Sequence, residues 1–288
     1  MRRAIAALAC AGLMAGCGTS AAPKHAVTRP ASTTTATTPA KPRSHHYRKV
    51  ARLTLPAKIE PRSVPVAILT YHRVAHLADE PVKSIPDETV EPETFFAHLK
   101  ALKAAGFHTI TQEQLFNALV GGRPLPQKPV MISVDDGYRD DYARIFPALK
   151  YFRMVATFYV ISQRVGEPGF LTARQVRKLD DAGMDIGAHT RHHVQLVGLP
   201  ADQLRSEVSG SKRDLERILH HPVYWFAYPF GSHDAAAEAA VGHAGFLLAT
   251  TTEGGTPAAS SLVTEPRVHV GRLATPAEVV ALAQAGSG

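Results

Sequence analysis

Cysteine is almost absent from the chain. Only two of the 288 residues are cysteines, and both, Cys10 and Cys17, lie close to the amino terminus. After residue 17 there is no thiol for a disulfide bond or for a thiolate metal site. A metal site in that part of the chain must therefore use histidine, aspartate or glutamate as ligands.

Most of the chain also lacks a net positive charge, although the formal net charge of the whole sequence is +7. Residues 1–62 contain 11 of the 32 Lys and Arg but only one of the 25 acids, Glu60, and so carry a net charge of +10. Residues 63–288 are left with a net charge of −3. The excess that would suggest nucleic-acid binding thus belongs to the amino-terminal segment, and we expect no nucleic-acid partner.

No hydrophobic run is long enough for a mature membrane-spanning helix. Residues 1–17 contain two arginines, a short apolar run and small residues before Cys17, which is the layout of a secretory signal. Residues 13–17 also resemble the lipobox of bacterial lipoproteins. We therefore expect an exported protein anchored to the outer face of the cell membrane by a lipid on Cys17; the alternative is a cleaved signal and a secreted protein.

Large apolar residues are rare from residue 18 to residue 62. This stretch is rich in Thr, Ala, Pro, Ser, Lys and Arg, so it cannot bury enough surface to offset the entropy of ordering. It is predicted to be a disordered basic tether, either solvated or in contact with an anionic surface. The catalytic domain is predicted to cover residues 63–288.

From residue 64 onward, short β-branched runs alternate with amphipathic stretches. The predicted strands are residues 64–71, 107–110, 130–134, 155–161, 184–188, 223–227 and 246–250. The predicted helices are residues 92–105, 112–120, 142–151, 173–182, 201–219 and 235–244. Repeated strand–helix units indicate a parallel α/β fold, either a barrel or a doubly wound sheet, with its chemistry at the carboxyl ends of the strands.

Four motifs fall at such strand ends. Asp135 and Asp136 precede Gly137 after one apolar run, which alone is as typical of a turn as of a site. His189 and His193 follow another; on a helical turn, a spacing of four brings both imidazoles to one side, although surface histidines often cluster too. The other two motifs are an aromatic-Pro-aromatic-Gly turn at residues 228–231 and a histidine, His72, after the first predicted strand.

These motifs resemble those of the polysaccharide deacetylases, carbohydrate esterase family 4, also called the NodB homology domain. Residues 133–137 are similar to the family's Thr-Phe-Asp-Asp-Gly motif, and residues 189–193 match its His-Ser/Thr-x-x-His motif. Residues 226–231 resemble the third motif, in the form typical of the poly-N-acetylglucosamine deacetylase branch. The resemblance covers about residues 64–275 and implies an α/β fold, a distorted (β/α) barrel of about seven parallel strands.

Carried over to this chain, the resemblance implies a divalent metal, most often Zn²⁺, with Co²⁺ or Ni²⁺ as alternatives. Its ligands would be Asp136, His189 and His193. It further implies that Asp135 is the general base, that His72 protonates the leaving amine, and that the backbone N–H of Phe230 stabilises the oxyanion. The aromatic and rigid residues expected to contact the sugar are Tyr138, Tyr228 and Pro229.

Two features depart from the family pattern or leave it open. Ala227 stands where the family's other branch carries an arginine that orients the base, so here either another group orients Asp135 or Asp135 is less constrained. Four further histidines are rivals of His72 for the role of proton donor: His192, His233, His243 and His269.

The resemblance predicts a hydrolase that removes N-acetyl groups from an amino-sugar polymer, of the poly-N-acetylglucosamine or peptidoglycan type, at the cell envelope. Its partner would be an acetylated glycan. Two alternatives stay open: a polysaccharide O-acetyl esterase, because esters are easier to hydrolyse than amides, and a catalytically silent glycan-binding surface lipoprotein.

Overall fold

The computed structural model describes residues 52–79 and 86–286. The predicted signal, with Cys10 and Cys17, and most of the predicted tether lie outside the described residues. The last part of the tether, residues 52–62, has no regular secondary structure, and the Leu53 N–H donates a hydrogen bond to Tyr224 Oη at 3.1 Å. In the described part of the chain, no helix is long and apolar enough to cross a membrane.

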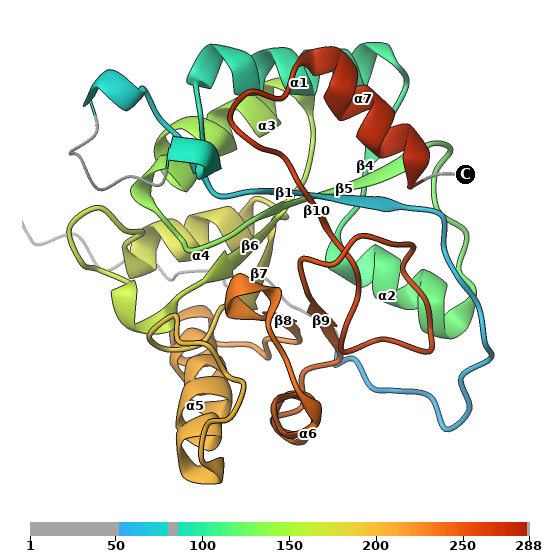
Figure 1. Cartoon of the computed structure of the whole chain (residues 1–288), viewed down its shortest axis with the longest axis vertical. Helices are drawn as coiled ribbons and strands as arrows, with labels where there is room; N and C mark the ends of the chain where they lie inside the picture. Colours follow the sequence, from blue (N-terminus) through green and yellow to red (C-terminus); the bar gives the residue numbers. More distant parts are fainter. Residues whose placement is uncertain (1–51, 80–85, 287–288) are drawn as a thin grey trace, which may run out of the picture. The chain divides into compact units, whose positions relative to one another are not determined.

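One parallel sheet forms the centre of the domain (Figure 1). Its strands are β1 (Ala67–Tyr71), β4 (His108–Thr109), β5 (Pro129–Val134), β6 (Thr157–Val160), β7 (Asp185–Ala188), β8 (Trp225–Ala227), β9 (Leu248–Thr250) and β10 (Val268–His269). Their order is β10-β1-β5-β6-β7-β8-β9, with β4 paired to β5 outside this path, and every pair is parallel. This confirms the predicted distorted (β/α) barrel rather than a doubly wound sheet.

The chain after β9 runs between the two edges of this sheet. The backbone of Thr251 donates a hydrogen bond to Glu265 at 2.9 Å, beside β9. A few residues later, β10 pairs with β1 through Leu69 and Val268. This crossing segment, residues 251–267, therefore lies between β9 and β1, and it brings residues from near the carboxyl terminus into the barrel.

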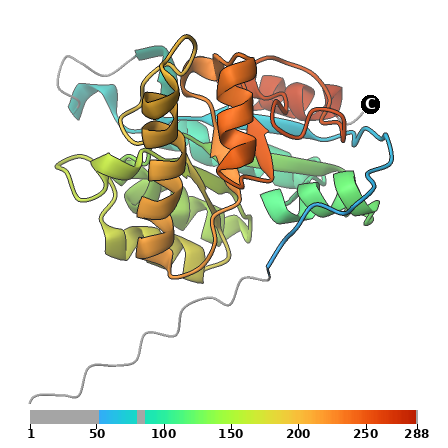
Figure 2. The same ribbon diagram turned by 90° about the horizontal axis from the view of Figure 1, so that it is seen from below.

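Helices surround the sheet on its outer side (Figures 1 and 2). They are α1 (Pro92–Ala104), α2 (Gln112–Gly121), α3 (Phe146–Phe152), α4 (Ala173–Asp181), α5 (Ala201–Leu219), α6 (Ala235–His243) and α7 (Pro276–Ala285). Figure 1 shows α1 beside α7, and Figure 2 shows α5 beside α6. The sequence predicted all of them except α7, and the predicted helix 142–151 begins as a π-helical turn, Asp141–Ile145, before α3.

The strands are buried on both faces, as their continuous apolar sequences predict. Every residue of β1, β6, β7, β8 and β9 is buried. Glycines follow three of the helices: Gly106, Gly183 and Gly245 have φ angles of 80°, 87° and 81°, in the left-handed region that glycine adopts without a steric cost.

Candidate metal and catalytic site

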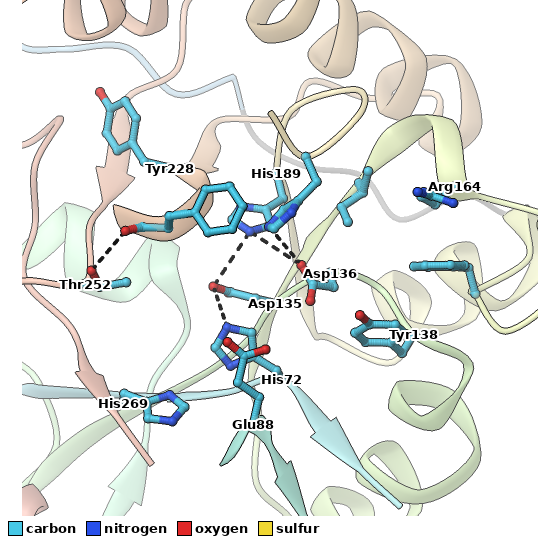
Figure 3. A pocket seen from close by; sticks show the side chains of 14 residues that line it. His72, Glu88, Asp135, Asp136, Tyr138, Arg164, His189, Tyr228, Thr252 and His269 are labelled. Atoms are coloured by element: carbon cyan, nitrogen blue, oxygen red, sulfur yellow. Dashed lines mark hydrogen bonds and ion pairs between the residues drawn. The ribbon is translucent and has the colours of Figure 1, made fainter. Parts of the chain in front are cut away.

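A cavity of about 560 Å³ opens at the carboxyl ends of the strands (Figure 3). Residues of all four sequence motifs line it, and they come from the ends of β1, β5, β7 and β8. The parallel sheet explains this convergence, because the carboxyl ends of its strands meet at one edge.

The backbone after β5 turns sharply and separates two neighbouring carboxylates. Asp136 and Gly137 have φ angles of 77° and 78°, so the chain reverses within two residues. A Cβ atom on Gly137 would lie 3.0 Å from Val160 Cγ1, so glycine also permits close packing against β6. The turn lets Asp135 and Asp136 face the cavity in different directions and take different roles.

Asp136, His189 and His193 form a compact group of metal-ligating atoms. The Oδ1 atom of Asp136 lies 3.6 Å from His189 Nε2 and 3.4 Å from His193 Nε2. This oxygen is buried and accepts no hydrogen bond from any residue in ranges 52–79 and 86–286. An unpartnered buried carboxylate oxygen between two imidazole nitrogens fits a divalent cation.

The nitrogen atoms are oriented for this purpose. His189 Nδ1 lies 2.7 Å from the carbonyl oxygen of Ala227, which can only accept a hydrogen bond. The proton therefore sits on Nδ1, and Nε2 presents its lone pair to the cavity. Burial also lowers the pKa of His189 to about 3, which keeps the imidazole in the neutral form that binds metals.

The two histidines come together without a helical turn, and the local geometry expected from the sequence was wrong in this respect. The chain from His189 to His193 is irregular, with left-handed φ angles of 59° at both Thr190 and His193. The His193 N–H donates to Thr190 Oγ1 at 2.9 Å, which closes the turn. The Thr190 side chain therefore stabilises the turn, in place of the backbone hydrogen bonds of a helix.

Glu207 on α5 holds the outer side of the same loop. One oxygen of its buried carboxylate accepts hydrogen bonds from the N–H groups of Arg191 and His192, each at 3.0 Å. Its other oxygen lies 2.7 Å from His192 Nδ1. His192 therefore points away from the metal group and fixes the loop that carries His193.

The electrostatics of Asp136 also favour a cation. Burial, followed by the charges of Asp135 and Glu88, raises the pKa of Asp136 to about 8. The ionised carboxylate is thus disfavoured until positive charge arrives to compensate it.

Asp135 has a different environment, because Arg267 binds it. Arg267 Nη1 donates to Asp135 Oδ1 and Nη2 to Oδ2, both at 2.7 Å, and both side chains are almost completely buried. Burial alone would raise the pKa of Asp135, but the charge of Arg267, the charge of His189 and the hydrogen bonds from Arg267 together outweigh it and hold this pKa well below its usual range. Asp135 is therefore ionised at neutral pH.

Arg267 is the group that orients Asp135 in place of the arginine missing at position 227. No motif in the sequence pointed to it. It lies in the crossing segment, directly before β10, so a residue from the carboxyl-terminal part of the chain binds the carboxylate of Asp135. The sequence signal for Arg267 is no more than a cation next to the short alternating run Val268-His269-Val270.

His72 lies on the far side of Asp135 from the metal group. Its Nε2 is 4.0 Å from Asp135 Oδ2, and its buried Nδ1 has no hydrogen-bond partner in the described part of the chain. Burial lowers the pKa of His72 to about 4, so the resting imidazole is neutral. His269 faces it, with the two ring centroids 5.5 Å apart, and lines the same cavity.

The other rival histidines lie elsewhere. His233 Nδ1 is 2.8 Å from Glu238, and His243 is exposed on α6. Neither is among the residues that line the cavity. Of the four rivals, only His269 reaches the site.

The predicted sugar-contacting residues differ in their placement. Tyr138 lines the cavity and stacks on Phe170, with ring centroids 5.0 Å apart. Tyr228 and Pro229 are buried; Tyr228 borders the cavity, but Figure 3 shows its ring directed away from the metal group. Phe230 is 64% exposed. Its ring contacts that of His193 in a tilted arrangement, with the ring centroids 4.7 Å apart.

Phe230 owes its position to an uncommon backbone. Its φ angle is 61°, and that of Gly231 is 68°, two consecutive residues in the left-handed region. A Cβ atom on Gly231 would overlap Thr252 Oγ1 and lie 2.6 Å from the Thr252 backbone nitrogen. Glycine is thus required for the turn that presents Phe230 beside the metal group.

Two comparisons by sequence identify similar proteins. A family model described as polysaccharide deacetylase matches residues 122–249. A putative polysaccharide deacetylase, YxkH of Bacillus subtilis (strain 168), is 31% identical over 196 residues, which cover 68% of this chain and 67% of the relative. The poly-β-1,6-N-acetyl-D-glucosamine N-deacetylase of Escherichia coli (strain K12) is 26% identical over 212 residues, which cover 59% of this chain but only 32% of the relative.

Among solved structures, the Streptococcus pyogenes deacetylase PplD in complex with acetate has a similar fold. The superposition covers 77% of this chain and 99% of PplD, with a TM-score of 0.71 and 25% sequence identity. The similarity therefore extends over almost the whole of that chain.

Proposed function

The chain belongs to the polysaccharide deacetylases of carbohydrate esterase family 4, and on that premise we propose that it is a divalent-metal-dependent N-deacetylase of an amino-sugar polysaccharide at the cell envelope. The observation that carries the proposal is the pairing of two sites within one cavity. Asp136, His189 and His193 offer ligands to a metal, while Asp135, fixed by Arg267, lies beside them as a free base.

The proposed metal is zinc, because two imidazole nitrogens and one carboxylate oxygen are a ligand set typical of hydrolytic zinc sites. Asp136, His189 and His193 would hold it and leave its remaining positions open to the cavity. Such an ion polarises the acetyl carbonyl and lowers the pKa of water.

Asp135 is proposed as the general base that takes a proton from the attacking water. The bidentate contact with Arg267 keeps its carboxylate ionised and in one orientation. The same proton must later reach the sugar nitrogen, because an amide nitrogen leaves only when it is protonated.

His72 is proposed to deliver that proton. It is neutral at rest, and its Nε2 lies 4.0 Å from Asp135 Oδ2, so it can receive the proton during turnover and pass it to the nitrogen. The backbone N–H of Phe230 is proposed to stabilise the oxyanion, and Tyr138, with Phe170 stacked on it, to contact the sugar.

The proposed substrate is an N-acetylated polymer of the poly-N-acetylglucosamine or peptidoglycan type. The printed activity of the Escherichia coli relative supports this class, although this chain spans only about a third of that relative's length. The proposed place of action, at the outer face of the cell membrane through a lipid on Cys17, rests on the sequence of residues 1–17.

The test is a panel of acetylated glycans incubated with the full chain, with acetate release as the readout. We expect acetate from N-acetylglucosamine oligomers or peptidoglycan, loss of release on chelation, and recovery on addition of zinc. The Asp135→Asn variant should bind zinc but release no acetate. Absence of acetate from every acetylated glycan by the zinc-loaded wild type would overturn the proposal.

A further inference from the structure

The cavity contains one carboxylate that the proposed mechanism does not use. Glu88 ends the short 3₁₀ helix η2 (Pro86–Glu88), is half-buried, and lines the cavity together with His72 and Asp135. Within residues 52–79 and 86–286, no group donates a hydrogen bond or forms an ion pair with it. No sequence motif marks this residue, because its position depends on contacts distant along the chain.

The backbone around Glu88 is fixed from both sides. The strands β2 (Arg73–Val74) and β3 (Thr89–Val90) pair in parallel, with Arg73 opposite Thr89. The Arg272 N–H donates to the Asp87 carbonyl at 3.0 Å. The position of Glu88 is therefore set by the fold.

Glu88 lines the same cavity as His72. The two residues directly precede Arg73 and Thr89, which are paired between β2 and β3. Figure 3 shows both side chains on the same side of Asp135, away from Asp136. Glu88 thus lies on the side of the cavity where the proposed mechanism returns the proton to the leaving nitrogen.

Within the part of the chain that the structure describes, the charges that act most strongly on Glu88 are negative. Burial, followed by the charges of Asp135 and Asp87, raises the pKa of Glu88. The nearby buried cation, Arg267, has both terminal nitrogens engaged by Asp135. A positive charge that appears on a ligand at this point would therefore be stabilised by Glu88.

We propose that Glu88 determines the selectivity for amides over esters, by stabilising the positive charge that develops on the leaving sugar nitrogen. This inference rests on the proposed function. In amide hydrolysis, the water oxygen bonds to the acetyl carbon, the C–N bond breaks, and the nitrogen gains protons to become an ammonium group as acetate is released. In ester hydrolysis, the C–O bond breaks and the leaving oxygen becomes a neutral hydroxyl, so Glu88 has no cation to stabilise.

The experiment measures kcat/KM for acetate release from a matched pair of oligosaccharides, one N-acetylated and one O-acetylated. The variant is Glu88→Gln, which keeps the size of the side chain and removes its charge. We expect kcat/KM for the amide to fall about tenfold or more, and that for the ester to stay within about twofold of wild type. Glu93→Gln, which removes the charge of an exposed acid on α1, is the matched control and should change neither value.

Product binding supplies a second readout that does not depend on turnover. Binding of the de-N-acetylated oligomer, measured by calorimetry on zinc-loaded protein, should weaken in Glu88→Gln, while binding of the O-deacetylated oligomer should not. Glu88→Asp, which restores the charge, should recover part of the amide activity. The melting temperature and zinc content of each variant show whether the fold and the metal site are intact.

Each outcome has a definite meaning. Equal losses on amide and ester, or an unchanged ratio in Glu88→Gln, would overturn the role in selectivity while leaving the proposed function in place. A zinc-loaded wild type that releases no acetate from the amide would instead overturn the proposed function and the selectivity with it.

Discussion

Arg267 and Asp135, 132 residues apart in the sequence, form a bidentate ion pair inside the barrel, with both N–O distances at 2.7 Å. The arginine reaches the carboxylate from the segment that crosses between β9 and β1. The closure of the barrel and the orientation of the proposed base are therefore achieved by the same stretch of chain.

Replacing Arg267 should impair catalysis more than metal binding. Arg267→Lys keeps a positive charge but cannot make two parallel hydrogen bonds, so Asp135 would lose its fixed orientation. We expect kcat on N-acetyl oligomers to fall about 100-fold, with zinc content unchanged. Arg272→Lys, at an exposed neighbouring arginine, is the control and should retain wild-type activity.

The stability of the same pair is tested separately. Arg267→Met leaves the charge of Asp135 buried and uncompensated, which should cost about 3–5 kcal/mol in the free energy of unfolding. Adding Asp135→Asn to Arg267→Met should restore part of this stability, although not the activity. If Arg267→Met unfolds at the same denaturant concentration as wild type, the ion pair contributes nothing and this account of the barrel closure is wrong.

Glu207 should affect metal affinity although it does not contact the metal group. Its carboxylate holds the loop that positions His193, so Glu207→Ala should weaken zinc binding by about 10–100-fold, as measured by competition with a chelator. Asp202→Asn removes an exposed acid from the first turn of the same helix and is the control. Unchanged zinc affinity in Glu207→Ala would show that the loop keeps its shape without this contact.

The metal-free protein should lose stability as the pH rises. In the unfolded chain the carboxyl group of Asp136 ionises near pH 4. In the folded metal-free protein the same carboxyl group keeps its proton up to about pH 8. Between these values the folded state binds the extra proton, so this contribution to stability is present at low pH and lost as the pH increases. The difference in melting temperature between zinc-loaded and metal-free protein should therefore widen over this range.

Glu265 adds a contribution of the same sign, because burial raises its pKa to about 8 as well. It lies outside the metal group, so it should act equally in the zinc-loaded and metal-free forms. The metal-free Asp136→Asn variant isolates the effect of Asp136 and should show a flatter dependence of melting temperature on pH. An Asp136→Asn curve parallel to that of the metal-free wild type would contradict the assignment.

The parts of the site that were predictable from the sequence are those that depend on local order. Asp135, Asp136 and His72 directly follow strands whose apolar runs are visible in the sequence, and parallel strands necessarily bring such ends together. His189 and His193 were paired correctly, but for the wrong local reason, because Thr190 and Glu207 shape their loop instead of a helix.

The parts that were missed depend on distant contacts. Arg267 joins the site only because the crossing segment lies between β9 and β1, which no local pattern reveals. Glu88 is placed by β2 and β3, which have two residues each and are therefore too short for a periodic signal. Both residues are charged groups whose function depends on the barrel that surrounds them.

The decisive measurement for the proposed metal-dependent deacetylase is acetate release as a function of bound zinc. Metal-free full chain is titrated with zinc, and acetate released from an N-acetylglucosamine oligomer is measured at each step. We expect release to rise with bound zinc and to reach its maximum at a single equivalent, whereas Asp136→Asn should show no such rise. Full release from protein shown to be free of metal, or none from protein with a filled site, would contradict this expectation.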